Sequence, residues 1–331
     1  MKEKLEALFN NIKSLCESEV ERIIEFVAGI LSENQQSDEK PDCPYCGSGI
    51  TIKYGHRNGK PRFLCHGCDR TFMHTTNSVM SHSHYGRSVW HDFIRDTLYG
   101  MTLDHSAEEL GFSHQTAFNM RHKVLIALQD LISGSPTVLS RLAELDETFV
   151  LDCYKGAKLP DGVKRKPRKH GAKASSPGIS DEYVAICTAV QRDGGAVAMT
   201  VNRAKPSKEE LEKVYSGHLE AGTVALTDGL RSYSVLRKQF HCLVVDVNHE
   251  EDKSFFNLNI VNSMHSYIKE AYVRYRGVAT KYINRYNAMF SLAFRNIKDQ
   301  AEDAFASLCQ MGRTCLWHGV KEIKAHSLVY L

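Results

Sequence analysis

Apolar residues recur along the chain with two different periods, and the change between them divides the sequence. Over residues 1–38 and 85–132 they recur every three or four positions, which is the pattern of amphipathic helices. From Leu139 the pattern changes to short apolar or alternating runs, which are typical of strands. A helical pattern returns over residues 258–308. The sequence therefore predicts a helical front part followed by a mixed α/β domain.

Within the α/β part, the runs LAELDETFVLDCY, TVALTDGL and CLVVDVN each predict a strand. Residues 183–202 predict a two-stranded hairpin that turns at Asp193-Gly194-Gly195, and YSVLRKQF predicts a helix. This order of elements favours a mixed sheet covered by helices. A chain of 331 residues is long enough for two or three folded units.

Residues 42–80 contain two C-x-x-C pairs at the spacing C-x2-C-x18-C-x2-C, which is typical of zinc ribbons. Two short strands are predicted around Asn58-Gly59, a strong hairpin signal, and a third after the last cysteine. Four thiolates fill a tetrahedral zinc site and leave no open position, so we predict a structural zinc site. Its ligands are Cys43, Cys46, Cys65 and Cys68. The basic residues around the ribbon either meet phosphates or form a solvated face, and the sequence leaves both interpretations open.

Residues 106–123 have the layout of a helix-turn-helix. A short helix ends at Gly111, a tight turn follows, and Ser113 is suited to cap the next helix. The second helix would present polar and basic side chains to DNA. These candidates are Gln115, Asn119, Arg121 and Lys123.

Composition narrows the class of protein. With 42% hydrophobic and 24% charged residues the chain is typical of soluble globular proteins, and a net charge of +3 does not by itself indicate nucleic acid. The sequence has no apolar run of about 18 residues and no apolar core behind a basic N-terminus, so we expect a cytoplasmic protein without a membrane segment. Six of the ten cysteines are scattered, and we expect them to be buried thiols.

Two carboxylates accompany the predicted strands: Asp146 lies within Glu144–Thr148, and Asp228 follows TVALT. If the two strands are neighbours, these carboxylates can hold divalent metal for a phosphodiester displacement. The alternative is an ordinary turn at a strand end, and spacing alone does not exclude it.

The helix predicted from Asn259 has a polar face, because Asn262, His265, Ser266 and Lys269 lie at i, i+3, i+4 and i+7. Basic and aromatic residues interleave after it, as expected of a surface that follows a nucleic-acid backbone. The alternative is a helix end with half-buried tyrosines. The basic candidates here are Arg274, Arg276 and Lys281.

A second basic segment, residues 155–173, directly follows the first carboxylate strand. It is either a solvated loop or a DNA contact, and we favour DNA contact because such a loop would gain affinity by releasing counterions. The residues proposed for this contact are Lys164, Arg165, Lys166, Arg168 and Lys169.

The cysteine quartet, LAELDETFV, LTDGLRSY and the helix NIVNSMHSYIKEAYVRYRGVATKYINRYNAMF together resemble the insertion-sequence transposases of the ISXO-type group, over roughly residues 40–295. The resemblance implies a ribonuclease H-like catalytic domain with a DDE-type site for Mg²⁺ or Mn²⁺. Asp146 and Asp228 would be metal ligands, and Asn262 stands where many such enzymes have Glu. A neutral amide holds metal more weakly than a carboxylate. Lys269 would contact a phosphate, and His265 would be close to the metal or contact DNA.

The residue pattern and the resemblance together predict five segments: an N-terminal helical segment (1–40), a zinc ribbon (41–82), a helix-turn-helix region (83–136), the catalytic domain (137–300) and a helical tail (301–331). The implied function is binding of terminal inverted repeats, 3′-end cleavage and strand transfer. The partner would be double-stranded DNA, bound by a homodimer or a larger assembly at the bacterial nucleoid. Two alternatives remain open: a regulator that binds DNA without catalysis, and a nuclease on the same fold that cuts but never joins.

Overall fold

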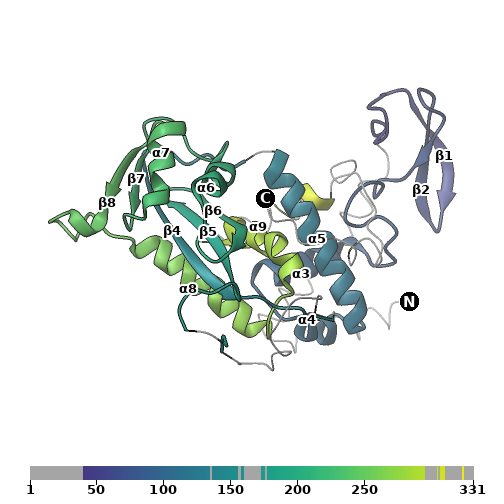
Figure 1. Ribbon diagram of the computed structural model, residues 1–331. Coiled ribbons are helices and arrows are strands. Elements are labelled where there is room, and N and C mark those ends of the chain that lie inside the picture. Colours follow the sequence, from purple (N-terminus) through teal and green to yellow (C-terminus); the bar gives the residue numbers. More distant parts are fainter. Residues whose placement is uncertain are drawn as a thin grey trace, which may run out of the picture. The chain divides into compact units, whose positions relative to one another are not determined.

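The computed structural model describes residues 40–134, 136–155, 158–159, 173–175, 177–294, 304, 306–309 and 323 (Figure 1). They fall into two compact units. The first contains the described residues up to Phe93 and residues 306–309. The second contains the described residues between Ile94 and Ala304, and Ile323. The division lies inside helix α3 (Arg87–Leu98). The helix predicted over residues 1–38 and most of the tail predicted over 301–331 lie outside the described residues.

The first unit contains the predicted ribbon. Strands β1 (Thr51–Arg57), β2 (Lys60–Cys65) and β3 (Thr71–Phe72) form an antiparallel sheet in that order. Asn58 and Gly59 both have positive φ, 52° and 76°, as a tight hairpin turn of this kind requires. Phe63 and Phe72 stack in a small core beside Cys43 and Cys65. The predicted hairpin and its third strand are confirmed.

The second unit is built on a five-stranded mixed sheet. Its strands are β4 (Leu142–Leu151), β5 (Tyr183–Gln191), β6 (Ala196–Arg203), β7 (Val224–Thr227) and β8 (Leu243–Asp246). The order across the sheet is β6-β5-β4-β7-β8. Neighbours among β4, β5 and β6 pair antiparallel, whereas β7 runs parallel to β4 and β8 parallel to β7. All strands predicted for this part are present, and the mixed α/β class is confirmed.

Helices cover both faces of this sheet (Figure 1). Helices α6 (Lys208–Tyr215) and α7 (Ser234–Gln239) pack on one face over an apolar core that includes Leu145, Cys187 and Ala189. Helices α8 (Asn259–Arg274) and α9 (Ile283–Ala293) contact β4, β5 and β6. Because side chains alternate along β4, Leu145 faces the α6 and α7 layer while Glu144 and Asp146 face α8.

Two features of this unit differ from the sequence prediction. Helix α6 was not predicted, although Ser207 and Glu210 form a capping box at its start and provide a usable signal. The single helical run predicted over 258–308 is wrong, because α8 ends at Arg274 and the chain turns through Arg276 and Gly277 at φ 53° and 87°. Residues in this left-handed conformation cannot continue a helix.

The second unit also includes α4 (Leu103–Glu109) and α5 (His114–Gly134), joined by a turn with Gly111 at φ 70°. Ser113 Oγ accepts a hydrogen bond from Thr116 N at 3.1 Å, so it caps α5 as predicted. Helix α5 packs against α4 and α9. None of the described helices is both long and apolar enough to cross a membrane.

Candidate metal site and active site

The four predicted cysteines converge. Their sulfur atoms all lie within 4.8 Å of one another. The Sγ atoms of Cys43 and Cys68 are 3.6 Å apart, as are those of Cys46 and Cys65. In the described part of the chain this is the one group of three or more Cys, His, Asp or Glu side chains that meets this limit. The predicted convergence of the two pairs is confirmed.

Local backbone geometry makes each pair point inward. Gly47 follows the first pair with φ 72°, and its N–H donates to Cys43 O at 2.9 Å. Asp69 follows the second pair with φ 54°, and Cys65 N donates to Arg70 O at 3.0 Å. A left-handed residue after each pair turns the chain back, so both thiols of a pair face the same point.

The Cys65 thiol is prepared for ionisation. Burial opposes its ionisation, but the backbone N–H groups of Gly67 and Cys68 and hydrogen bonds from the neighbouring thiols outweigh burial and lower its pKa to about 7. Gly67 N donates to Cys65 Sγ at 3.2 Å. Because the thiolate is the form that binds metal, this thiol can enter a metal site near neutral pH.

The two predicted carboxylates are brought together by a parallel strand pair. Residues 142–144 of β4 pair with 224–226 of β7 in register, ending with Glu144 opposite Leu226. Two residues further along stand Asp146, within β4, and Asp228, directly after β7, so the parallel pair brings the two residues side by side. Burial and the charge of Asp228 raise the pKa of Asp146 to about 6, while the Glu147 N–H and the Lys269 ammonium lower it.

Asp228 is held by its own turn. It is exposed, its Oδ1 accepts from Leu230 N at 3.0 Å, and its carbonyl oxygen accepts from Asn248 Nδ2 at 2.7 Å. Gly229 has φ 80°, and the Asp246 carboxylate fills the space that a Cβ would need there. Only glycine therefore fits this turn, which fixes the direction of the chain directly after Asp228.

A buried carboxylate fixes α8 against the sheet. Glu144, which is 0% exposed, accepts hydrogen bonds through Oε2 from Ile260 N at 2.8 Å and Val261 N at 3.1 Å. Its Oε1 accepts from Arg192 Nε at 2.8 Å. Leu258, at the N-cap position of α8, supplies no side-chain cap, so Glu144 satisfies N–H groups that this helix end leaves open. These hydrogen bonds fix the start of α8 against β4 at Glu144, two residues before Asp146; we call this contact the clamp on α8.

The residues on the polar face of α8 differ in how close they come to the carboxylates. His265 is 6% exposed, and its Nδ1 lies 3.9 Å from Asp146 Oδ2. Lys269, one turn later, is exposed and close enough for its charge to act on Asp146. Asn262 is also exposed, and among the described residues its side chain forms no hydrogen bond to Asp146 or Asp228. The structure thus brings His265 and Lys269 to the first carboxylate, and leaves Asn262 near the start of the helix, toward solvent.

Glu147 is a residue at this site that the sequence analysis did not single out. It follows Asp146 on β4 and faces the opposite layer, where its Oε1 is buried without a hydrogen-bond partner. Burial, together with the negative charges of Asp146 and Asp228, raises the pKa of Glu147 to about 7. Tyr233 and Lys205 act in the opposite direction and lower this pKa. The available signal was a second acid, next to Asp146, in a strand covered on both faces.

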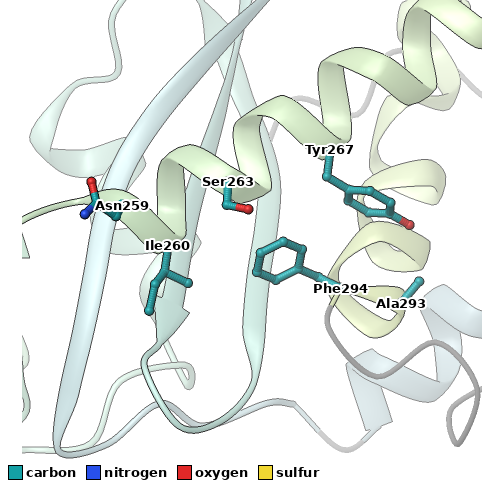
Figure 2. A pocket seen from close by; sticks show the side chains of 6 residues that line it. All are labelled: Asn259, Ile260, Ser263, Tyr267, Ala293 and Phe294. Atoms are coloured by element: carbon teal, nitrogen blue, oxygen red, sulfur yellow. The ribbon is translucent and has the colours of Figure 1, made fainter.

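A small cavity of about 420 Å³ lies beside this site, between α8 and the end of α9. Figure 2 shows the Phe294 ring beneath α8, facing Ser263 and Tyr267. The ring centroids of Tyr267 and Phe294 are 6.0 Å apart. The cavity is lined by Asn259, Ile260, Ser263, Tyr267, Ala293 and Phe294.

The structure corrects one predicted DNA contact. Arg121 is 1% exposed, donates to Met101 O at 2.8 Å and lies over the Tyr275 ring, because α5 buries this face against the rest of its unit. Its guanidinium is therefore not available to a phosphate. Lys123 is half-buried, and burial lowers its pKa to about 8. Gln115 is exposed and donates to Asn119 at 3.0 Å.

The remaining predicted contacts differ in their surroundings. Arg274 and Arg276 are exposed at the end of α8, where Arg274 Nη1 donates to Gly100 O at 3.3 Å. Lys281 is half-buried and its ammonium lies 4.9 Å from the centre of the Tyr282 ring. The proposed loop contacts Lys164, Arg165, Lys166, Arg168 and Lys169 lie outside the described residues.

Comparison with known proteins finds a family match in the second half of the chain. Residues 139–296 match the ISXO2-like transposase domain family, and this stretch begins just before β4 and ends just after α9. This part of the chain is therefore similar to transposase domains of the insertion-sequence type.

A full-length relative agrees with that assignment. The chain is 24% identical over 276 residues to an uncharacterized protein in the transposable element ISH50 of Halobacterium salinarum, covering 81% of this chain and 90% of that protein.

Two solved structures were also matched. A pre-cleavage Mos1 transpososome is 12% identical with a TM-score of 0.27, covering 71% of this chain and 80% of that one. The Mos1 strand transfer complex is 13% identical with a TM-score of 0.28, covering 71% and 79%. Scores this low support no argument about the fold.

Proposed function

We propose that the protein is a DNA transposase that cleaves the 3′ ends of an insertion sequence and joins them to target DNA. The observation on which this rests most directly is the parallel pairing of β4 with β7, which places Asp146 within β4 beside Asp228, the residue directly after β7. The transposase-domain match spans both residues and the polar face of α8. The alternative is that the two aspartates belong to ordinary turns at strand ends. That alternative does not explain why the buried Glu144 also fixes α8 next to Asp146.

The strand order supports a ribonuclease H-like fold for this domain. Three antiparallel strands come first in the chain, and two later strands then extend the sheet from the first of them in parallel. A parallel neighbour for the first strand places the middle of β4 beside the carboxyl end of β7, on the strand that α8 contacts. This topology would bring Asp146 and Asp228 close together although they are far apart in sequence.

Asp146 and Asp228 are the residues suited to hold Mg²⁺ or Mn²⁺, since carboxylate oxygens are the preferred ligands of these ions. When bound, such ions activate the attacking water or 3′ hydroxyl and stabilise the leaving oxygen. The crowding that raises the pKa of Asp146 fits this role, because a bound cation would relieve the burial and repulsion of the two carboxylates. Asn262 would add a neutral oxygen, and Lys269 would hold a DNA phosphate near the carboxylates.

The other parts of the chain would recognise DNA. We infer that the cysteine quartet holds structural zinc, because four thiolates at tetrahedral reach leave no ligand position for chemistry. The ribbon and the α4–α5 pair would bind the terminal inverted repeats, through the exposed Gln115 and the half-buried Asn119 in the first half of α5. Arg274, Arg276 and Lys281 would contact phosphates near the catalytic edge. Since two ends must be joined in one event, we expect a homodimer or larger assembly on DNA.

The decisive experiment uses purified full-length protein and two DNA substrates: an intact element end, taken from the inverted repeats flanking the gene, and a pre-cut end with a free 3′ hydroxyl. We expect cleavage of the first and joining of the second into a plasmid, both dependent on Mg²⁺ or Mn²⁺. Cleavage without joining would identify a nuclease, and binding without either reaction would identify a regulator.

The carboxylates are tested in the same assay. Asp146→Ala and Asp228→Ala should each lower both reactions by on the order of a thousandfold or more while leaving DNA binding intact. Glu270→Ala is the matched control, because Glu270 is an exposed acid on α8 directly after Lys269. Wild-type rates in either aspartate variant would overturn the assignment.

A further inference from the structure

His265 is the side chain of α8 that comes closest to the carboxylate site. It contacts two residues of the sheet, because β4 and β5 pair Asp146 opposite Thr188. Its Nε2 lies 2.6 Å from Thr188 Oγ1, and its Nδ1 lies 3.9 Å from Asp146 Oδ2. Only 6% of the surface of His265 is exposed, so its ring is almost entirely enclosed by the protein.

The hydrogen bonds of Thr188 determine which nitrogen of His265 bears the proton. The Thr188 hydroxyl donates its single proton to the carbonyl oxygen of Asp146 at 2.8 Å. With that proton committed, the hydroxyl accepts from His265, and we assign the ring proton to Nε2 from this hydrogen-bond network. The separation of 3.9 Å between Nδ1 and Asp146 Oδ2 is too long for a hydrogen bond between them.

Nδ1 thus directs a lone pair at a carboxylate oxygen with no proton between them. Two acceptors facing each other inside a protein are unfavourable unless a cation lies between. Divalent ions sit about 2.0–2.2 Å from nitrogen or oxygen ligands, so one ion can reach both atoms when they are less than about 4.2 Å apart. The separation in this protein meets that condition.

We propose that His265 Nδ1 is a ligand of the divalent ion held at Asp146, and that Thr188 fixes the ring in the tautomer this requires. The proposal rests on the proposed function, which places the ion at Asp146. It gives the site a nitrogen ligand in addition to its oxygens. The weakness of a neutral Asn262 is then offset by a second neutral ligand on the next turn of α8. A nitrogen donor favours Mn²⁺ relative to Mg²⁺, since Mg²⁺ prefers oxygen.

The experiment uses full-length, zinc-loaded protein titrated with Mn²⁺ alone, with no DNA present. Mn²⁺ is paramagnetic and the tetrathiolate zinc is not, so pulsed EPR detects only the added ion. We expect modulation from a directly bound ¹⁴N nucleus, replaced by the ¹⁵N pattern when the protein is made with ¹⁵N-histidine. Because this measurement is made on the wild-type protein, it does not depend on a variant that folds.

Three variants assign the nitrogen. His265→Gln should abolish the nitrogen signal and weaken Mn²⁺ binding, and Thr188→Val should weaken binding by about tenfold by releasing the tautomer. His249→Gln is the matched control, because His249 is an exposed histidine whose Nε2 lies 3.4 Å from a different carboxylate, Asp246. It should leave both signal and affinity unchanged.

The outcomes separate this inference from the proposed function. Mn²⁺ that binds in an Asp146-dependent manner without nitrogen coupling would overturn the role of His265 and leave the carboxylate site standing. Loss of the nitrogen signal in His249→Gln but not in His265→Gln would equally overturn it. Mn²⁺ binding that is unaffected by Asp146→Asn would contradict the carboxylate site itself.

Discussion

The two candidate metal sites of this chain are built in opposite ways. The cysteine site is local: four side chains of one kind come from two short turns of one small ribbon, and each turn is shaped by its own left-handed residue. The carboxylate site is assembled from β4, β7 and α8, and its members differ in chemistry, burial and charge. The first site would stabilise its surroundings by binding metal, whereas the second holds a buried acid at the expense of stability. This difference is what we expect between a structural metal centre and a reactive one.

The largest effect that would sharpen this comparison concerns the cysteine site. Cys65→Ser removes one of four thiolates, and structural zinc contributes on the order of 10 kcal/mol to such small modules. We expect the zinc content, measured by elemental mass spectrometry, to fall from about one ion per chain to near zero, and binding of the terminal repeat to weaken.

The matched control is Cys153→Ser, since Cys153 belongs to the second unit and not to the ribbon. It should retain zinc. Unchanged zinc in Cys65→Ser would contradict the tetrathiolate assignment. Joining of a pre-cut end at high DNA concentration should survive in Cys65→Ser if the two sites are as independent as their construction indicates.

The next effect concerns the clamp on α8. Glu144→Ala leaves two backbone N–H groups of α8 and the Arg192 guanidinium without their acceptor, and we expect a loss of about 3 kcal/mol in the free energy of unfolding. Cleavage should fall as well, because α8 is no longer fixed relative to Asp146.

Glu210→Ala is the comparison for that variant. Glu210 also serves a helix N-terminus, as part of the capping box of α6 on the other face of the sheet. Its loss should cost about 1 kcal/mol and leave cleavage nearly unchanged. Equal loss of cleavage in the two variants, at temperatures where both are folded, would show that the position of α8 is not what Glu144 controls.

A smaller effect follows from the raised pKa of Asp146. Its folded-state pKa of about 6 lies above the ordinary value of 3.8, so the fold favours the protonated acid and loses stability as pH rises through this window. Asp146→Asn cannot ionise, and without added divalent ions it should be about 2 kcal/mol more stable than the wild type at pH 8, allowing for partial solvent screening.

The advantage of Asp146→Asn should disappear as pH falls below about 4, where Asp146 becomes protonated in both the folded and the unfolded wild type. Urea unfolding at a series of pH values measures it, with the exposed Asp181→Asn as control. Adding Mn²⁺ should stabilise only the wild type. If the wild type were more stable than Asp146→Asn at pH 8 without metal, the carboxylate site would not cost stability, and the difference from the cysteine site would be contradicted.

The smallest effect tests the turns of the ribbon. Gly47→Ala places a Cβ on a residue at φ 72°, which should cost about 1 kcal/mol and weaken zinc affinity about fivefold. Asp69→Gly, at the equivalent turn with φ 54°, relieves a similar conformation and should not weaken binding. Competition with a chromogenic chelator measures both. Equal affinities for the two variants would mean that these turns do not shape the site.

Sequence patterns predicted the local features and missed those that depend on distant partners. The hairpin at Asn58-Gly59 and the cap at Ser113 follow from residues close in sequence, and both are confirmed. The burial of Arg121 depends on where α5 packs, which its own segment does not encode. Glu144 reads as an ordinary polar position of a strand, and only the fold shows it bound to α8.

The same limit applies to the candidate site. The sequence placed Asp146 and Asp228 in strands, but their register depends on a parallel pairing between segments separated by β5, β6 and α6. The spacing of Asn262, His265 and Lys269 predicted one shared face. The spacing could not show which of the three comes closest to Asp146, because the ring of His265 is oriented by Thr188, a residue of β5.

The parallel pairing of β4 with β7 also has a consequence for the order in which the protein is made. While β4, β5 and β6 can pair as they emerge from the ribosome, Asp146 has no partner until β7 has been synthesised, and α8 comes later still. An incomplete chain therefore contains the zinc ribbon that would hold DNA, but neither α9, against which α5 packs, nor an assembled cutting centre. Translation itself would keep binding ahead of cleavage, so prematurely terminated copies would occupy element ends without breaking them.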